Sequence, residues 1–154
     1  MKKLLLASAA SALVAGAVHA EAHGDAVKLG IILGFTGPIE SLTPAMAAGA
    51  EMAMAEVTES GGLLGGMGVE PVRADSTCVD SSAATAAAER LITADGIKGI
   101  MGADCSGVTG AVLTNVAVPN GIVMISPSAT SPALSTTEDN GLFFRTAPSD
   151  ARQG

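Results

Sequence analysis

Short apolar runs alternate with longer stretches of helical character along most of the chain. The apolar runs contain Val, Ile and Leu and are bounded by turn residues, which is typical of buried strands in a parallel sheet. Between the first four runs, small and apolar side chains recur at spacings of three and four, which indicates helices. The pattern predicts strands at residues 27–33, 69–75, 97–102, 122–126 and 142–146.

The first predicted helix starts beside a proline and ends at a glycine pair. Thr43 has the side chain of an N-cap, and Pro44 suits the first helical position. Gly61-Gly62 can end the helix. The inner face predicted from the spacing is Met46, Ala50, Ala53 and Val57.

Two further helices follow the second and third strands. Asp80, Ser81 or Ser82 can cap the first of them, and Ser106 can cap the other. Their predicted inner faces are Ala84, Ala88 and Leu91 for the former, and Val108, Val112 and Val116 for the latter.

The alternation of strands and helices predicts an α/β fold. Such βαβ units form a doubly wound parallel sheet with helices on both faces and right-handed crossovers. Ligands bind to these sheets beyond the carboxyl ends of the strands, near the point where the strand order reverses. The segments expected to carry function are therefore 34–43, 75–80, 103–107 and 126–131.

Composition excludes two classes of protein. The 154 residues include 8 Lys and Arg against 15 Asp and Glu, a formal net charge of −7, whereas a nucleic-acid surface needs clustered basic residues. Hydrophobic residues make up 48% of the chain, too many for an intrinsically disordered protein. We therefore expect one globular domain, or one lobe of a larger protein, with no nucleic-acid partner.

The first 20 residues have the features of a secretory signal peptide. Lys2 and Lys3 precede an uncharged apolar run, and Val18-His19-Ala20 places small residues where a signal peptidase cleaves. The alternative is a membrane anchor, but a run of roughly 15 residues is shorter than the roughly 20 that span a bilayer. The sequence thus predicts a signal peptide at 1–20, a ligand-binding lobe at 21–154, and an exported, periplasmic product.

Export changes how the two cysteines are interpreted. Cys78 and Cys105 would lie in a compartment where disulfides persist, and a disulfide between them is favoured over two free thiols. Neither is a good candidate nucleophile, because His19 and His23 are the chain's two histidines and both lie at the signal-peptide junction. For the same reason no metal site is expected.

The loops after the third and fourth predicted strands carry the most informative polar residues. Ser106, beside Asp104, would lie at a helix N-terminus, where it can help to bind an anion or simply cap its own helix. Ser128, Ala129 and Thr130 form a stretch of small residues that lets a ligand approach the backbone, although an ordinary Ser/Thr-rich turn has the same composition.

Enzymatic readings have little support in the sequence. It contains no G-x-S-x-G nucleophile elbow, no G-x-G-x-x-G fingerprint and no phosphate-binding G-K-[ST]. No catalytic residue and no cofactor are predicted.

Several segments taken together resemble a known family. They are VKLGIILGFTGP, GAEMAMAEV before a Gly-Gly pair, GADCSGVTG, GIVMISPSATSPALS and FFRTAPSDARQG. The chain from 27 to 154 resembles the N-terminal lobe of the branched-chain amino-acid (Leu/Ile/Val-type) binding proteins of ABC transporters, which have the type I periplasmic binding fold.

The resemblance implies a role for individual residues. Ser106 matches the serine whose hydroxyl and N–H hold the ligand carboxylate, and Thr130 matches the threonine whose N–H joins that site and whose hydroxyl meets the ammonium. Ser128 matches a position that offers its backbone carbonyl to the ammonium. Cys78 and Cys105 match the family's disulfide.

Two residues depart from the family pattern. Leu42 stands where some members place an aromatic residue against the ligand side chain, and Asp104 stands where close relatives carry an apolar residue. Both belong to the predicted ligand site, and both leave the identity of the ligand open. The family also has a second lobe that closes over the ligand, so the resemblance implies an N-terminal fragment.

The function implied by the resemblance is that of an extracytoplasmic solute-binding component of an ABC importer. It would bind a small amino acid or related carboxylate between two lobes and deliver it to a membrane permease. The alternatives are a ligand-sensing receptor or regulatory domain of the same fold and, with less support, an exported α/β hydrolase.

Overall fold

Five parallel strands form the centre of the part of the chain that the computed structural model describes, residues 26–152. The order across the sheet is β2-β1-β3-β4-β5, and every neighbouring pair is parallel. The α/β prediction is confirmed, and each strand lies where the apolar runs predicted it. The strands are β1 (Val27–Leu33), β2 (Val69–Asp75), β3 (Gly99–Gly102), β4 (Val123–Ser126) and β5 (Phe143–Arg145).

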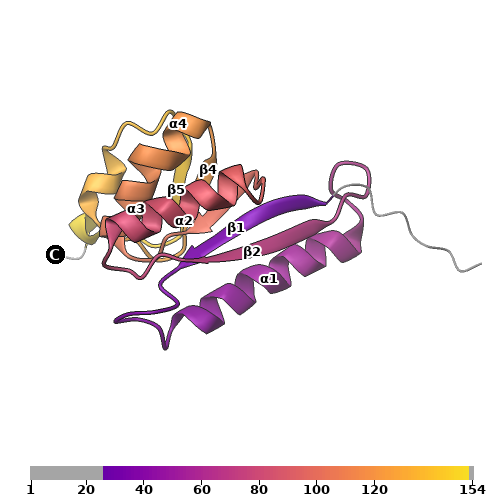
Figure 1. The fold of residues 1–154 in the computed structure, drawn as a ribbon, viewed down its shortest axis with the longest axis horizontal. Helices are drawn as coiled ribbons and strands as arrows, with labels where there is room; N and C mark the ends of the chain where they lie inside the picture. The colour runs from indigo at the N-terminus through magenta and orange to yellow at the C-terminus, as the bar shows by residue number, and fades with distance from the viewer. Residues whose placement is uncertain (1–25, 153–154) are drawn as a thin grey trace, which may run out of the picture.

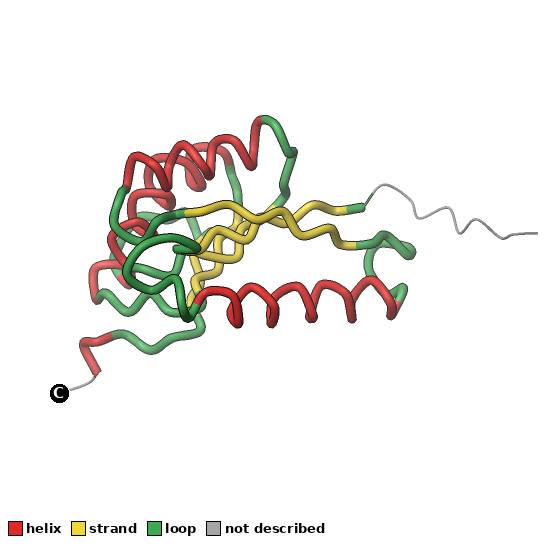
Figure 2. Tube along the Cα trace, turned by 60° about the horizontal axis from the view of Figure 1, so that its bottom comes forward, coloured by secondary structure: helices red, strands yellow, loops and turns green. Residues whose placement is uncertain are grey.

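Helices lie on both faces of this sheet, as Figures 1 and 2 show. Helix α1 (Thr43–Ser60) lies along one face, next to β1 and β2. Helix α2 (Ser81–Thr93) and the helix that follows β3 pack against each other on the opposite face. The helix after β3 is continuous through three segments: α3 (Ser106–Val112), the π-helical η1 (Leu113–Ala117) and α4 (Val118–Asn120). Two short 3₁₀ helices lie elsewhere, η2 (Pro132–Ser135) and η3 (Asp150–Arg152).

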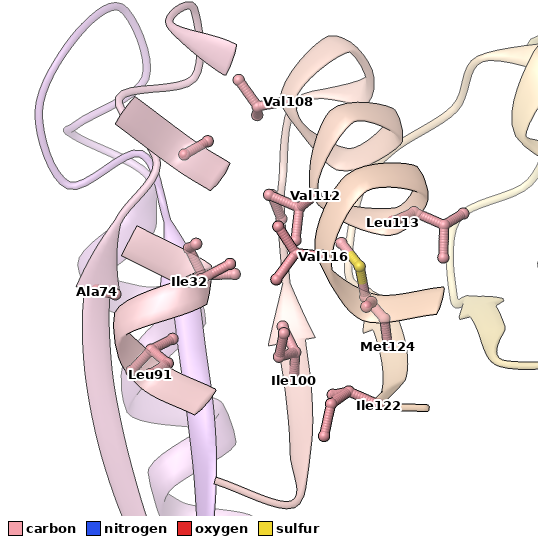
Figure 3. Packing of buried hydrophobic residues seen from close by; sticks show 14 of the residues in the cluster. Ile32, Ala74, Leu91, Ile100, Val108, Val112, Leu113, Val116, Ile122 and Met124 are labelled. Carbon is pink, nitrogen blue, oxygen red and sulfur yellow. The ribbon is translucent and has the colours of Figure 1, made fainter. Parts of the chain in front are cut away.

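The larger hydrophobic core lies between the sheet and the α2–α3 layer (Figure 3). Strand residues Ile32, Ile100 and Met124 pack there against the helices, and each is at most 3% exposed. The predicted inner faces of α2 and of the α3–η1 helix are confirmed, because all of their residues are buried: Ala84, Ala88 and Leu91, and Val108, Val112 and Val116.

The predicted inner face of α1 is wrong in part. Ala53 and Val57 are exposed, and the buried residues are Thr43, Ala47 and Met54. Alanine and methionine occur around most of this helix, so small apolar spacings fit more than one face and the periodicity does not select among them.

Thr43 is also not the N-cap of α1. Leu42 occupies that position without a side-chain cap hydrogen bond. The Thr43 side chain is instead buried, and its hydroxyl donates to the Gly34 carbonyl oxygen at 3.2 Å. The start of α1 is thereby tied to the carboxyl end of β1.

Gly102, the last residue of β3, allows a close approach to β1. Its φ is +132°, and a Cβ at this position would lie 2.0 Å from the carbonyl oxygen of Ile32. A side chain would therefore push the two central strands apart where their carboxyl ends meet, so glycine is required there.

Helix α1 leaves part of its own sheet face uncovered. Val123, Ile125 and Phe144, on β4 and β5, are 40%, 43% and 54% exposed. Beside them, Met54 of α1 and Met101 of β3 line an open apolar hollow of about 310 Å³. The sheet is thus well packed on the α2–α3 side and only half covered on the α1 side.

The first 20 residues, predicted as a signal peptide, lie outside the described residues. No helix within residues 26–152 has both the length and the apolar character that crossing a membrane requires.

Two isoleucines on adjacent strands test this asymmetry in the chain of residues 21–154. Ile100 is 3% exposed and Ile125 is 43% exposed. We expect Ile100→Val to lower the free energy of unfolding by about 0.5–1.5 kcal/mol, because it removes a methylene from a packed core. Ile125→Val should change it by less than about 0.5 kcal/mol. Urea unfolding followed by circular dichroism measures both, and equal losses would contradict the exposed position of Ile125.

Candidate functional site

The loops that follow β1 to β4 lie together at the carboxyl edge of the sheet, as the parallel topology predicts. A disulfide joins Cys78, after β2, to Cys105, after β3, with their Cα atoms 5.2 Å apart. The predicted pairing is confirmed. It closes a loop of 27 positions, worth about 3–4 kcal/mol in the chain-entropy account of disulfides.

Ser106 connects the start of α3 to the loop after β4. Its Oγ accepts hydrogen bonds from the backbone N–H groups of Thr130 and Ser131, each at 3.1 Å. The helix cap is Cys105, not Ser106, so the alternative that this serine only caps its helix is wrong. Because both bonds use the oxygen as acceptor, the hydroxyl hydrogen of Ser106 is left to donate to another group.

The Thr130 hydroxyl is a hydrogen-bond donor, whereas the Ser106 hydroxyl is an acceptor. Its hydroxyl donates to Oδ2 of Asp150 at 2.9 Å, and the Asp150 N–H donates to the Thr130 carbonyl at 2.9 Å. With its hydrogen directed at Asp150, the Thr130 oxygen can accept a hydrogen bond from a further donor. The structure therefore brings a hydroxyl that can donate, on Ser106, close to a hydroxyl that can accept, on Thr130.

Further hydrogen bonds fix the loop after β4, which carries Thr130. Ala129 is buried, and its N–H donates to the Ser126 Oγ at 3.0 Å. The Ser128 hydroxyl donates to the backbone carbonyl of Asp104 at 3.0 Å, which joins the loops after β3 and β4. Arg145, on β5, donates through Nη1 to the carbonyls of Ala129 at 3.3 Å and Ser131 at 2.9 Å.

The Asp104 side chain points into the protein. It is 3% exposed, and its two carboxylate oxygens accept hydrogen bonds from the N–H groups of Gly34 and Cys105 at 2.8 and 2.9 Å. The sequence placed Asp104 in the predicted ligand site, and the structure buries its side chain between the loops after β1 and β3.

Leu42 lies in the loop after β1, at the start of α1, and is 61% exposed. The hydroxyl of its neighbour Thr43 is tied to Gly34, so Leu42 is carried by the same carboxyl edge of the sheet. The hydrogen-bonded group formed by Ser106, Thr130 and Ser128 does not include it. Contact between Leu42 and a ligand remains a prediction.

A second polar group joins the loops after β1 and β2. The Thr36 hydroxyl donates to Oδ2 of Asp75 at 2.6 Å, and the Thr77 N–H donates to Oδ1 at 2.8 Å. Partial burial alone would raise the pKa of Asp75, but hydrogen bonds from Thr36, Thr77 and the backbone of Phe35 hold that pKa below its ordinary value. Gly37 packs so closely on Thr77 that a Cβ would lie 2.5 Å from the Thr77 carbonyl oxygen.

Sequence reasoning missed Arg145 and Asp150, and it gave no role to Ser126, although this residue lies in the predicted segment 126–131. Arg145 carried a usable signal, because it is a charged residue inside the short apolar strand LFFRT, where a cation needs partners. Ser126 and Asp150 follow ordinary turn and strand-end patterns and carried no such signal. Among residues 26–152, no group of three or more His, Cys, Asp and Glu side chains is arranged to hold a metal ion.

Comparison with known proteins gives a consistent result. Residues 26–154 match the family described as periplasmic binding protein. A leucine-, isoleucine-, valine-, threonine- and alanine-binding protein of Pseudomonas aeruginosa is 33% identical over 145 residues, which are 94% of this chain and 38% of that protein. The chain thus spans little more than a third of the length of this relative.

Solved structures agree in fold. A branched-chain amino acid transporter substrate binding protein of Streptococcus pneumoniae, in complex with isoleucine, superposes with a TM-score of 0.73 at 27% identity, covering 82% of this chain and 35% of that one. A solute binding protein of an R. palustris ABC transporter, in complex with benzoate, gives a TM-score of 0.66 at 29% identity, covering 80% of this chain and 33% of that one.

The hydrogen bonds to Asp75 predict how acid affects stability. Since the pKa of Asp75 is lowered in the folded protein, its carboxylate stabilises the fold above the unfolded-state value of about 3.9, and this contribution is lost as the pH falls through the lower folded value. We expect Asp75→Asn to make the free energy of unfolding less dependent on pH below about 4, as measured by urea unfolding across that range.

Thr36→Val is the matched variant, because it keeps the carboxylate and removes its hydroxyl donor. It should weaken the same pH dependence by a smaller amount. An acid response identical to wild type in both variants would show that this group does not contribute.

Proposed function

Because the chain belongs to the periplasmic binding protein family, we propose that it is the first ligand-binding lobe of an extracytoplasmic solute-binding protein that captures a small amino acid. The protein would present the ligand to the membrane permease of an ABC importer. Its action would be capture and release, without a chemical step.

The observation that carries this proposal is the opposite polarity of Ser106 and Thr130. Ser106 accepts two backbone N–H groups and keeps its hydrogen to donate, which suits a carboxylate. Thr130 donates to Asp150 and keeps its oxygen to accept, which suits an ammonium group. A free α-amino acid carries both groups on its α-carbon, so one end of the ligand satisfies both hydroxyls.

The roles of the neighbouring residues follow from this arrangement. Ser106 and the N–H groups at the start of its helix would hold the carboxylate, while Thr130 and the backbone carbonyl of Ser128 would face the ammonium. Leu42, exposed on the neighbouring loop, would contact the ligand side chain. Ala129 would shape the floor of the site, because its side chain is buried and its N–H is bonded to Ser126.

Closure over the ligand would need a second lobe. The relatives are longer than this chain, which covers 38% of the P. aeruginosa protein, and hinge closure of two lobes is a common way to bury a small ligand. The disulfide and the predicted signal peptide both support an oxidising location outside the cytoplasm.

A carboxylate without an ammonium group is the second candidate ligand. The R. palustris neighbour is in complex with benzoate, and the Ser106 donor would suit any carboxylate. A benzoate-type ligand would leave the Thr130 oxygen and the Ser128 carbonyl without a donor, so we favour an amino acid.

The test uses the full-length natural protein and calorimetric titration with L-leucine, L-leucinamide and 4-methylpentanoate. Leucine should bind, and loss of either its carboxylate or its ammonium charge should weaken binding. Ser106→Ala should raise the Kd for leucine about 10- to 150-fold, the range expected for a hydrogen bond to a charged group, and should have much less effect on the residual binding of leucinamide.

Ser60→Ala is the matched control, because the Ser60 hydroxyl also accepts a backbone N–H but lies at the far end of α1. It should leave the Kd unchanged. Equal effects of Ser106→Ala on all three compounds would contradict the assignment of Ser106 to the carboxylate. A wild-type protein that binds 4-methylpentanoate and not leucine would favour the second candidate.

A further inference from the structure

Asp104 is the point at which several strand-end loops meet. Its Oδ2 accepts the N–H of Gly34 at 2.8 Å, at the end of β1. Its Oδ1 accepts the N–H of Cys105 at 2.9 Å and the hydroxyl of Ser76 at 3.4 Å, at the end of β2. Its backbone carbonyl accepts the hydroxyl of Ser128, after β4, at 3.0 Å.

The carboxylate is satisfied by neutral donors. It is 3% exposed, and a buried carboxylate is tolerated when hydrogen bonds replace its hydration. The donors come from different loops, so each loop must keep its position for the carboxylate to stay satisfied. Charge-assisted hydrogen bonds of this kind are stronger than bonds between neutral groups, which makes the junction a rigid one.

We propose that Asp104 is a positioning residue whose carboxylate holds the loops after β1, β2 and β3 in their binding geometry, and that it does not itself contact the ligand. The proposal rests on the proposed function, because it concerns the affinity of the same site. Ser106 follows Asp104 by two residues, and Gly34 begins the loop that carries Leu42, so both sides of the site depend on this carboxylate.

The other links between loops do not duplicate this one. The disulfide joins the loops after β2 and β3, and Asp75 joins those after β1 and β2. Asp104 supplies the direct link from the loop after β1 to the loop after β3. Without it, the ligand would have to order these loops on binding, which lowers affinity.

Asp104→Asn in the full-length natural protein tests the proposal with little change in size. An amide has one acceptor oxygen and one NH₂ group, so either the Gly34 N–H or the Cys105 N–H would face a donor. We expect the Kd for L-leucine to rise at least about tenfold, at a temperature where thermal melts show the variant to be fully folded.

Amide hydrogen exchange supplies a local readout. At least one of the N–H groups of Gly34 and Cys105 should exchange faster in Asp104→Asn, while the N–H of Met124, bonded to the Leu142 carbonyl just before β5, should keep its protection. A general loss of stability would instead raise the exchange of all three. That result, or a Kd within twofold of wild type, would overturn the proposal.

Asp95→Asn is the matched control, because Asp95 pairs with Arg90 on the surface just after α2, on the approach to the start of β3. It should leave the Kd unchanged, and an equal rise in both variants would also overturn the proposal. If Asp104→Asn does not fold, Ser76→Ala decides the matter. This variant removes one donor to Oδ1, and it should raise the Kd by about two- to fivefold, half or less of a full hydrogen-bond effect; an unchanged Kd would overturn the proposal.

Failure of this proposal is distinguishable from failure of the proposed function. A wild-type protein that does not bind L-leucine would remove the proposed function, and the inference about Asp104 with it. A wild type that binds leucine while Asp104→Asn binds it equally well would remove only the inference.

Discussion

A parallel sheet brings the carboxyl ends of its strands to one edge, where backbone groups emerge that no neighbouring strand can pair. In this protein, buried and half-buried side chains at that edge supply missing partners. Asp104 accepts from the loops after β1 and β2, Ser106 from the loop after β4, and Arg145 donates to that same loop from β5. Hydrogen bonds also set the polarity of the Ser106 and Thr130 hydroxyls, because each bond decides whether an oxygen or a hydrogen is left for another group.

The sequence carried most of the information about the fold. Strand positions could be predicted because short runs of Val, Ile and Leu alternate with turn residues, and the inner faces of α2 and α3 because their apolar residues recur at helical spacing on a single face. The prediction of the inner face of α1 was wrong in part, because Ala and Met occur around most of this helix and leave no single apolar stripe. Its buried face is decided by what the sheet offers, namely the space beside Ile31 and Leu33 that Ala47 fills.

The site was predictable in its location and less so in its chemistry. Topology alone directs attention to the strand ends, and the cysteine pairing follows from the cysteine count and the compartment. The direction of each hydrogen bond does not follow from the sequence. Serine is a common N-cap residue, yet Cys105 and not Ser106 is the N-cap of α3. Aspartate usually lies on the surface, yet Asp104 is buried. Both outcomes depend on residues more than 20 positions away, which local patterns do not reveal. They are Thr130 and Ser131 for Ser106, and Gly34 and Ser76 for Asp104.

The close contact between Gly37 and Thr77, together with the disulfide and the buried bonds of Asp104, has a kinetic consequence. Loops that are already fixed do not have to find their arrangement after a small molecule arrives. Under the proposed function, a first encounter with this lobe would then need no rearrangement of its loops, and differences in affinity among related molecules would arise mainly from how long each one stays. Rigidity at the strand ends would therefore act on residence time.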